Sequence, residues 1–266
     1  DRTRTVTRVA EPATWYLAVN LRHEELRRLD LRRAMSLSLD RREFTETVLA
    51  GSAMPAEGFV PPSIGAGGSR TFREVSGSLL AADPNRPEAE TLWMAYLKER
   101  RLQDLHLELA LPNSPTARRT AGQIKDRLEK ALPGLQIQLA PLEQRELLQR
   151  LRTGQFDLVF TGAGADYDDP LTFLELFLPD SFLNDTGWVN AEYDALVRAA
   201  EGAPSGEART RAMAAAEALL LQELPVIPLY HPVDYRLARP WLKGVQDFPL
   251  GAVLDLKGAY VEGRES

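Results

Sequence analysis

The chain has 266 residues, 44% of them hydrophobic and 26% charged, which is enough for one large domain or two small ones with a well-buried core. A formal net charge of −6 argues against a broad nucleic-acid surface, because such a surface needs a basic face. The absence of cysteine excludes disulfides, thiolate metal sites and cysteine nucleophiles.

The N-terminal sequence contains no targeting signal. It reads DRTRTVTRV, without an initiator Met or a charged-then-apolar signal segment, so we expect that processing or the choice of segment removed any signal. No apolar run in the chain reaches the roughly 18 residues of a membrane-spanning helix.

The first third of the chain is predicted to contain a strand, a helix and a long irregular segment. TWYLAVNL (14–21) alternates and carries aromatic and β-branched residues, which is typical of a strand. A helix is expected across 30–49, with arginines and acidic residues interleaved on a solvated face and Gly51 after its end. Residues 52–86 are rich in Gly, Pro, Ser and Ala, which indicates a functional loop or a linker.

The middle of the chain predicts a βαβαβ unit, preceded by a helix at 83–101. Leucines at every second position from 105 to 111 indicate a half-buried strand, and Ser114-Pro115 indicates the start of a helix. The expected elements of the unit are a strand at 105–111, a helix at 114–132, a strand at 135–139, a helix at 142–151 and a strand at 156–160. Such a unit implies parallel strands, and open α/β sheets bind ligands beyond the carboxyl ends of their strands. Further helices are expected at 171–177, 190–200 and 205–223, before an extended, proline-rich tail.

The segment FTGAGADYDDPLTF, which begins at the end of the third strand, suggests several kinds of site. Its glycines suggest a phosphate cradle, but neither GxxxxGK(S/T) nor a complete GxGxxG is present, and the acids would repel phosphate. DYDD supplies oxygens for calcium at alternating positions, yet the later glycine and bidentate glutamate of an EF-hand are missing. Asp168 or Asp169 is expected to cap the helix that begins near Pro170.

Two residues in this part of the chain are candidate ligand contacts. Asp166 is the acid closest to the strand end, where a carboxylate is a natural partner for a ligand ammonium. Trp188 lies in the polar loop NDTGWVN, where we expect an exposed aromatic side chain that contacts a partner. The three histidines lack metal-ligand spacing, and the sequence contains no GxSxG and no paired nucleophile and base. We therefore predict no metal site, no cofactor and no catalytic site.

Four segments carry a resemblance to a known family. They are TWYLAVNL with LRRAMSLSLDRREFTETVLAGSAMPAEGFVPPSI, then FDLVFTGAGADYDDPLTFLELF, NDTGWVNAEYDALVRAA and LPVIPLYHPVDYRLARPWLKG. In this order they resemble the bacterial family 5 extracellular solute-binding proteins, the oligopeptide, dipeptide and nickel receptors of ABC importers. The resemblance extends from Trp15 to Gly244, which is nearly the whole chain.

The resemblance implies an α/β fold, a periplasmic-binding-protein-like lobe of the type II class with the βαβαβ sheet flanked by helices. It corresponds to the C-terminal lobe of a two-lobed receptor, with 1–20 as a crossover strand, 21–229 as the solute-binding lobe and 230–266 as a tail that returns toward the other lobe. Apolar residues in the irregular segment and after Tyr230 are then expected to be exposed. The resemblance also predicts a self-association patch of Trp15, Tyr16, Tyr235 and Trp241.

The family's ligand site implies roles for particular residues. In peptide-binding members the Asp of the A-D-Y motif pairs with the ligand's N-terminal ammonium, and this Asp matches Asp166. The expected ligand-binding residues are Asp166, Gly162, Ala163, Gly164, Ala165, Tyr167, Trp188 and Gln144. Ala163 stands where the family often has Trp, and Phe160 stands where some members carry a basic residue. An aromatic wall and a contact to a ligand carboxylate are therefore absent from these positions.

The leading hypothesis is a noncatalytic substrate-binding component of an ABC importer for peptides or a related small amine-bearing solute. It would act outside the cytoplasm, in the periplasm or lipid-anchored at the outer face of the cytoplasmic membrane, with permease subunits as partners and without a cofactor. The alternatives are the solute-sensing lobe of a cytoplasmic transcriptional regulator and, less in keeping with the motifs, an enzyme. An export signal upstream of Asp1 would support the importer, and a helix-turn-helix would support the regulator.

Overall fold

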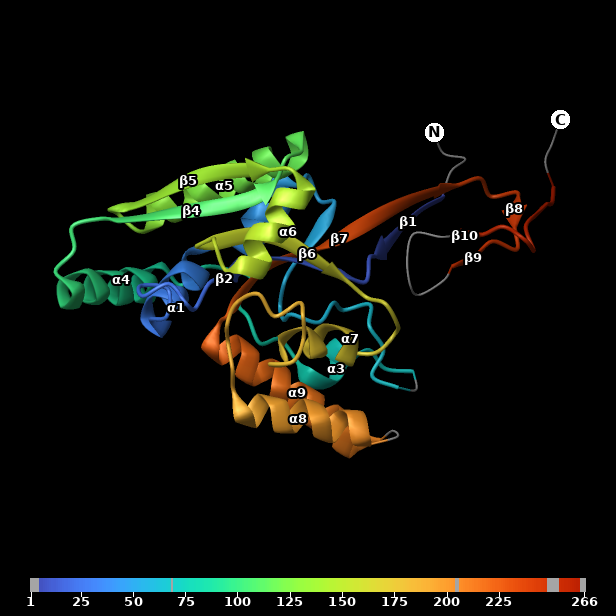
Figure 1. Cartoon of the computed structure of the whole chain (residues 1–266). Helices are drawn as coiled ribbons and strands as arrows, with labels where there is room; N and C mark the ends of the chain where they lie inside the picture. Colours follow the sequence, from blue (N-terminus) through green and yellow to red (C-terminus); the bar gives the residue numbers. More distant parts are fainter. Residues whose placement is uncertain (1–4, 68, 204–205, 248–253, 264–266) are drawn as a thin grey trace.

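The computed structural model describes residues 5–67, 69–203, 206–247 and 254–263, and Figure 1 shows a mixed sheet with helices on both faces. The predicted α/β class is therefore confirmed. The main sheet has the strand order β1-β7-β2-β6-β4-β5, with β3 paired to β7. Its strands are β1 (Thr5–Ala10), β2 (Ala13–Val19), β3 (Ala53–Pro55), β4 (Leu105–Pro112), β5 (Leu135–Leu142), β6 (Leu158–Gly164) and β7 (Val226–Ala238).

The predicted βαβαβ unit is confirmed. β4 pairs in parallel with β5 over all eight residues of each strand, and with β6 at two positions. The crossover helices are α5 (Pro115–Ala131) and α6 (Gln144–Thr153). Ser114 caps α5 as expected, because its hydroxyl accepts the amide of Ala117 at 3.1 Å. β2 runs antiparallel to both β6 and β7, so only the βαβαβ part of the sheet is parallel.

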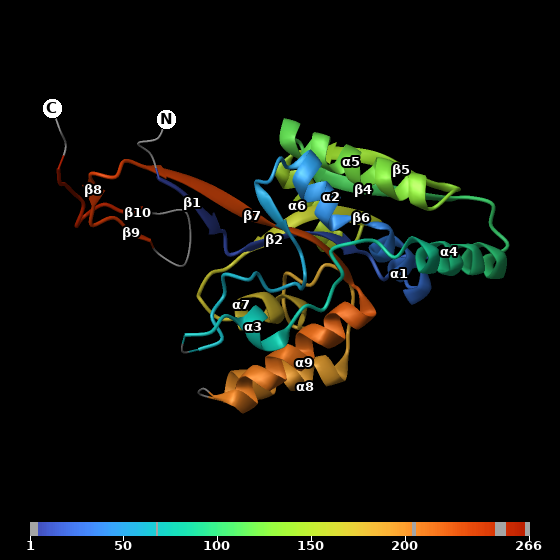
Figure 2. The same cartoon turned by 180° about the vertical axis from the view of Figure 1, so that it is seen from behind.

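The structure has two large hydrophobic cores, and Figures 1 and 2 show from opposite sides the helices and strands that surround them. One lies between the sheet and α1, α4 and α5. The other joins the segment 56–80 to α7, α8 and α9. The remaining helices are α1 (Leu29–Ser38), α2 (Arg41–Glu43), η1 (Phe44–Val48), α3 (Phe72–Ser76), α4 (Arg86–Arg100), α7 (Leu171–Leu174), η2 (Glu175–Phe177), α8 (Ala191–Gly202) and α9 (Glu207–Glu223).

The helix expected across 30–49 is interrupted at Leu39. This residue is extended, with ψ at 116°, and the side chain of Asp40 accepts the amide of Glu43 at 2.8 Å to start α2. The expectation that the arginines of this segment lie on a solvated face is wrong for Arg32 and Arg41, each of which is 4% exposed. The guanidinium of Arg41 donates at 2.7 Å to the carbonyl of Pro228 in β7, so a buried arginine ties the helix to the sheet.

The segment 52–86 is more ordered and more buried than predicted. It contains β3, which pairs with β7, and α3, which begins with a capping box at Thr71. Four of its apolar residues are fully buried in the second core, so the expected exposure is wrong for Phe59, Val60, Ile64 and Phe72. The segment is therefore part of this lobe's own core.

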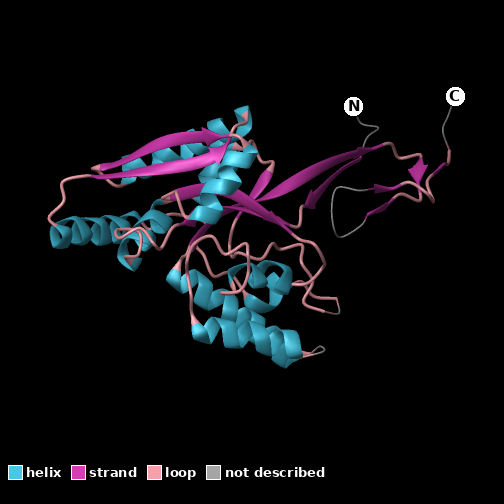
Figure 3. Ribbon diagram, viewed as in Figure 1, coloured by secondary structure: helices cyan, strands magenta, loops and turns pink. Residues whose placement is uncertain are grey.

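The predicted exposure of apolar residues agrees better with the structure in the tail after Tyr230. β7 extends away from the rest of the molecule together with β1, as Figure 3 shows, and Tyr235 and Leu237 are 52% and 58% exposed. The tail ends in two short ribbons formed by β8 (Leu242–Lys243), β9 (Gln246–Asp247), β10 (Leu254–Asp255) and β11 (Tyr260–Val261). Residues 248–253 of the predicted tail lie outside the described residues.

The expected self-association patch stays a prediction, and its four residues differ in exposure. The ring of Trp15 packs 4.9 Å from Phe160 and stacks at 6.2 Å on Tyr230, and the ring of Tyr16 packs 5.1 Å from Phe59. Trp15, Tyr16 and Trp241 are half-buried, whereas Tyr235 is exposed. Aromatic side chains of β2 therefore stabilise the interior of this lobe.

One buried carboxylate holds the segment 56–80 against α9. Glu217 is 0% exposed, and its Oε1 accepts the amides of Phe59 and Val60, both at 2.8 Å. The same oxygen accepts Nη2 of Arg73 at 2.5 Å, an ion pair whose side chains are 10% and 0% exposed. Three donors to Oε1 compensate part of the cost of burying this carboxylate, and they tie Phe59, Val60 and Arg73 to the helix.

We expect Glu217→Ala to lower the free energy of unfolding by about 3–5 kcal/mol, because it leaves two buried amides without their acceptor and the mostly buried Arg73 without its ion pair. Urea unfolding of the 266-residue chain measures the effect. Glu207→Ala is the matched control, since Glu207 lies in the same helix but is 82% exposed beside Arg211, and its loss should cost less than about 1 kcal/mol. Equal losses in the two variants would contradict the role assigned to Glu217.

Candidate functional site

β6, the strand before Asp166, pairs along its full length on one edge but at only two positions on the other. β2 pairs with β6 over its full length, from Val19 opposite Leu158 to Ala13 opposite Gly164. β4 pairs with β6 only at Leu158 and Val159. Beyond Val159, therefore, the second edge of β6 has no strand beside it within the described part of the chain. The glycines expected to form a loop are strand residues, because β2 continues to pair with them.

The main-chain groups on this edge include those of the two glycines. The amide of Ala165 donates to the carbonyl of Pro12 at 2.8 Å, so the backbone of Ala165 faces the β2 side. Because backbone direction alternates along a strand, Ala163 also faces β2, whereas the amides and carbonyls of Gly162 and Gly164 point to the open side. Both glycines are exposed. The edge thus offers main-chain donors and acceptors that no side chain of these glycines can cover.

Gly162 has a packing reason to lack a side chain. A Cβ at this position would lie 3.1 Å from the ring of Trp15, its partner across the pair with β2. At Gly164 a Cβ would meet nothing within 4 Å. The space beside Gly164 is therefore open, and a ligand backbone can approach it closely.

The three aspartates after β6 have different partners. Oδ1 of Asp168 accepts the amide of Gly65 at 2.8 Å. Asp169 forms two bonds to Arg209, at 2.7 and 2.9 Å, and its Oδ1 also accepts the amide of Leu171 at 3.0 Å. Leu171 is the first residue of α7, so Asp169 accepts the first amide of that helix from one position before Pro170, which occupies the N-cap in place of the predicted acid.

Asp166 is the acid that keeps its carboxylate free. Its amide donates to the hydroxyl of Thr172 at 3.0 Å, which fixes the backbone at this point. Asp166 is exposed, and its carboxylate has no hydrogen bond or ion pair with any residue that the structure describes. A fixed backbone with an unpaired carboxylate, directly after an open strand edge, is suited to a ligand cation.

Two other predicted site residues lie on the same side of the unit. Tyr167 is 42% exposed, and its hydroxyl donates to Glu175 at 3.1 Å. Partial burial, with the nearby Glu175 carboxylate, raises the pKa of Tyr167 above its ordinary value, so the phenol stays protonated as a donor. Gln144 is the exposed first residue of α6 and follows the carboxyl end of β5.

A polar cluster at the carboxyl ends of β4 and β5 escaped the sequence prediction. The side-chain amide of Asn113 donates to Glu143 at 2.5 Å, and Nε of Arg118 donates to Oδ1 of Asn113 at 2.9 Å. The signal was present in the sequence, because polar residues that follow two neighbouring parallel strands meet at one edge of the sheet.

The expected exposure of Trp188 is wrong. Trp188 is 5% exposed, its ring packs at 4.8 Å on Tyr193, and its Nε1 donates to Glu223 at 2.6 Å. The polar residues around it bond within the protein, since Asn184 donates to the carbonyl of Trp188 at 2.9 Å. The argument from exposure for a ligand contact at Trp188 therefore no longer holds.

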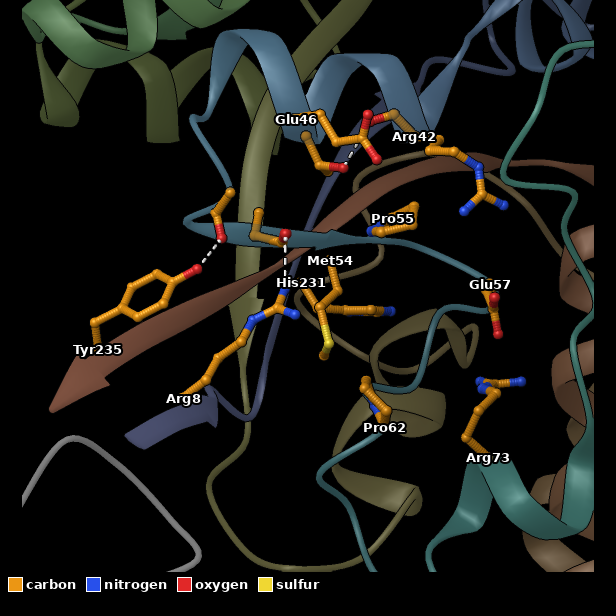
Figure 4. Close-up of a pocket in the computed structure, with 13 residues that line it drawn as sticks. Arg8, Arg42, Glu46, Met54, Pro55, Glu57, Pro62, Arg73, His231 and Tyr235 are labelled. Carbon is orange, nitrogen blue, oxygen red and sulfur yellow. Dashed lines mark hydrogen bonds between the residues drawn. The ribbon is translucent and has the colours of Figure 1, made fainter. Parts of the chain in front are cut away.

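A separate cavity of about 440 Å³ lies beside β3 and β7 (Figure 4). β2 and β7 separate it from the open edge of β6. Two arginines on its wall have internal partners, since Arg73 pairs with Glu217 and Arg42 pairs with Asp83. His231 is 2% exposed, and burial lowers its pKa to about 3, so the imidazole is neutral at ordinary pH. Glu46 and Glu57 on the same wall are exposed, and their carboxylates have no hydrogen bond or ion pair within the described residues, so Asp166 is distinguished by its place after β6 and not by the lack of a partner alone.

Solved structures define the class of protein to which this fold belongs. The peptide-bound OppA of Listeria monocytogenes superposes with a TM-score of 0.79 and 27% identity, covering 97% of this chain and 50% of that chain. A crystal structure of a peptide ABC transporter's peptide-binding protein superposes with a TM-score of 0.75 and 29% identity, covering 83% of this chain and 99% of that chain. The fold is therefore that of a type II periplasmic-binding-protein lobe.

The sequence comparison shows the family. The model of "Bacterial extracellular solute-binding proteins, family 5 Middle" matches residues 1–184, and the chain belongs to this family. The dipeptide-binding protein DppE of Bacillus subtilis is 30% identical over 252 residues, which are 94% of this chain and 46% of DppE. The murein peptide-binding protein MppA of Escherichia coli is 30% identical over 236 residues, which are 87% of this chain and 42% of MppA. The chain spans about half the length of the curated relatives it matches.

We expect the DYDD segment not to bind calcium, because Asp168 and Asp169 already serve an amide and an arginine. Within the described residues, no group of three or more His, Cys, Asp or Glu is placed to hold a metal ion. Adding calcium, with a chelator as the reference, should leave the melting temperature unchanged, since a ligand of the native state would raise it. A calcium-dependent rise in the melting temperature would overturn the assignment of these two acids.

Proposed function

We propose that this chain is the C-terminal lobe of the substrate-binding component of an ABC importer, and that it binds a peptide or a related small amine-bearing solute. The observation that carries the proposal is the unpaired edge of β6, which ends at the free carboxylate of Asp166. The names of the relatives, which include dipeptide-binding and murein peptide-binding proteins, support a peptide as ligand.

The geometry favours strand addition. An extended ligand beside β6 would exchange main-chain hydrogen bonds with Gly162 and Gly164, which give affinity without reading side chains. Its ammonium would form a charge-assisted bond with Asp166. Because Asp166 follows the carboxyl end of β6, a ligand with its N-terminus there would run antiparallel to the strand.

The remaining part of the binding surface belongs to a second lobe in this proposal. Residues 1–20 and 230–266 would then join the two lobes, with 21–229 as the solute-binding lobe. The β1 and β7 ribbon supports this division, because it extends away from the cores and carries the exposed Val6, Tyr235 and Leu237. β7 runs without a break through residue 230, so the proposed boundary between 229 and 230 falls inside one continuous strand.

The proposal includes a location outside the cytoplasm and permease subunits as partners. It includes no catalytic step and no cofactor, which agrees with a family of solute-binding proteins. Among the described helices, none is long and apolar enough to cross a membrane.

Asp166→Asn should weaken the binding of a free-amine peptide by about 1.5–3 kcal/mol, the range for a hydrogen bond to a charged group. Calorimetry on the protein at its natural length measures this change. The same peptide with an acetylated N-terminus should bind both proteins equally, because its ammonium is gone. Asp104→Asn is the control variant, since Asp104 is an exposed acid at the opposite end of β4. Unchanged affinity of Asp166→Asn for the free-amine peptide would refute the role of Asp166.

N-methylation of the ligand tests strand addition separately. Methyl groups on the alternate amides that face Gly162 and Gly164 should weaken binding by about 0.5–1.5 kcal/mol for each lost hydrogen bond. Methyl groups on the other amides, which point away from β6, should have little effect. Equal sensitivity at all positions would contradict an extended ligand on this edge, whatever the role of Asp166.

A further inference from the structure

The strand register builds one wall of the cavity beside β3 and β7. Side chains alternate along β7, so His231 and Tyr235 lie on the same face of this strand. Met54 of β3 is paired with His231, and Arg8 of β1 is paired with Tyr235, so these two side chains share that face. All four residues line the cavity of about 440 Å³ (Figure 4). The main sheet itself therefore supports this wall.

His231 has its ring proton on the nitrogen that faces the protein. Nδ1 lies 3.0 Å from Oγ1 of Thr14 and 3.3 Å from the carbonyl oxygen of Ala13. The Thr14 hydroxyl donates its own proton to the carbonyl of Phe59 at 2.7 Å, so Oγ1 accepts from the ring, as the carbonyl of Ala13 does. We therefore assign the proton of the neutral imidazole to Nδ1, which leaves a lone pair on Nε2.

Nε2 of His231 is an acceptor without a partner. His231 is 2% exposed, and its printed hydrogen bonds all involve Nδ1, so Nε2 has no partner among the described residues. In the same part of the chain, the unpartnered side-chain atoms that are sealed from solvent belong to Thr120, Asp194 and Glu217. Nε2 is thus not sealed off, and it opens into the cavity that His231 lines. A ligand N–H that reaches Nε2 gains a hydrogen bond that the protein does not supply.

The charges of the cavity wall favour a cation. Glu46 of η1 and Glu57 line the cavity, and both carboxylates lack a partner in the described structure. Of the three arginines on the wall, Arg42 and Arg73 form ion pairs with acids that are not part of the lining, which leaves Arg8. Two unpaired acids against one arginine give the cavity a net negative charge.

A metal ion does not match this wall, but an organic amine does. No three His, Cys, Asp or Glu in the described ranges are placed to hold a metal ion. Met54, Pro55 and Pro62 add apolar surface to the lining, which suits a short carbon chain between polar groups. The complementary ligand therefore combines N–H donors and positive charge with methylene groups.

We propose that this cavity is a second binding site, which takes a small aliphatic amine. One N–H of the amine donates to Nε2 of His231, its positive charge lies beside Glu46 and Glu57, and its methylene groups contact Met54. The site is separate from the open edge of β6, because β2 lies between β7 and β6. The argument does not rest on the proposed peptide site.

NMR of the chain with ¹⁵N-labelled histidine tests the site directly. The chain has three histidines, and His231 should show the Nδ1–H tautomer. Adding 1,4-diaminobutane should shift the Nε2 resonance of His231 more than those of His23 and His106, which lie outside the cavity lining. An Nε2–H tautomer, or no shift of this resonance with about 10 mM diamine, which nearly saturates a site with a dissociation constant of about 1 mM, would overturn the proposal.

Succinate tests the sign of the charge. It has a four-carbon chain like the diamine but carries two negative charges, so it should leave the Nε2 resonance of His231 unchanged. A shift with succinate as large as the shift with the diamine would overturn the choice of an amine, because the arginines of the wall would then select the ligand.

Glu46→Gln with Glu57→Gln should weaken diamine binding at least about fivefold, since two exposed charge pairs are lost. The same NMR titration measures this change, in a chain that also carries Asp166→Asn so that this carboxylate cannot hold the amine. Glu192→Gln with Glu207→Gln is the matched control, because it removes two exposed acids of α8 and α9 that lie outside the cavity lining. Equal weakening in both double variants, or none in the first, would refute the roles of Glu46 and Glu57.

Discussion

The structure depends on the pairing of β2 with two strands at once. β2 pairs with β7 along one edge and with β6 along the other, and the side chains of these three strands contribute to both cores. Leu17 and Val19 are fully buried beside the βαβαβ unit, while Tyr16 packs against Phe59 of the second core. Because β2 is longer than the contact between β4 and β6, it holds β6 in strand conformation beyond the point where β4 stops pairing. The open edge is a direct consequence.

The three aspartates show how surroundings assign roles to identical side chains. Asp168 and Asp169 are held by Gly65 and Arg209, which fixes the turn, and the hydroxyl of Thr172 fixes the backbone of Asp166. The carboxylate of Asp166 is then presented without an internal partner. A rigid loop that leaves one charge unpaired reduces the ordering cost of binding, because little conformational freedom is lost when a ligand arrives.

Two of the free edges of the sheet, those of β6 and β5, differ in whether their main chain is covered. Beside Gly162 and Gly164 the main chain is open, since glycine offers no side chain that could fold back over it. Beside Ile137 the main chain is closed by Lys125 and Glu129. Strand addition depends on main-chain groups that every protein has, so selectivity for one edge requires that the other be blocked. In the proposed binding mode, the two features together would direct an extended ligand to the edge that ends at Asp166.

The sequence by itself determined the βαβαβ unit, its helix cap at Ser114 and the place of Asp166 after a buried strand, because alternation, capping and turn chemistry act over a few residues. The family motifs were also legible in the sequence. The tertiary structure alone decided that GAG continues a strand, that Trp188 is buried against Glu223 and that the segment 56–80 belongs to the core. It also decided which partners hold Asp168 and Asp169. Each of these outcomes depends on a partner far along the chain, such as Gly65 and Arg209 for the acids and Glu217 for Phe59, and local propensity contains no information about contacts at that separation.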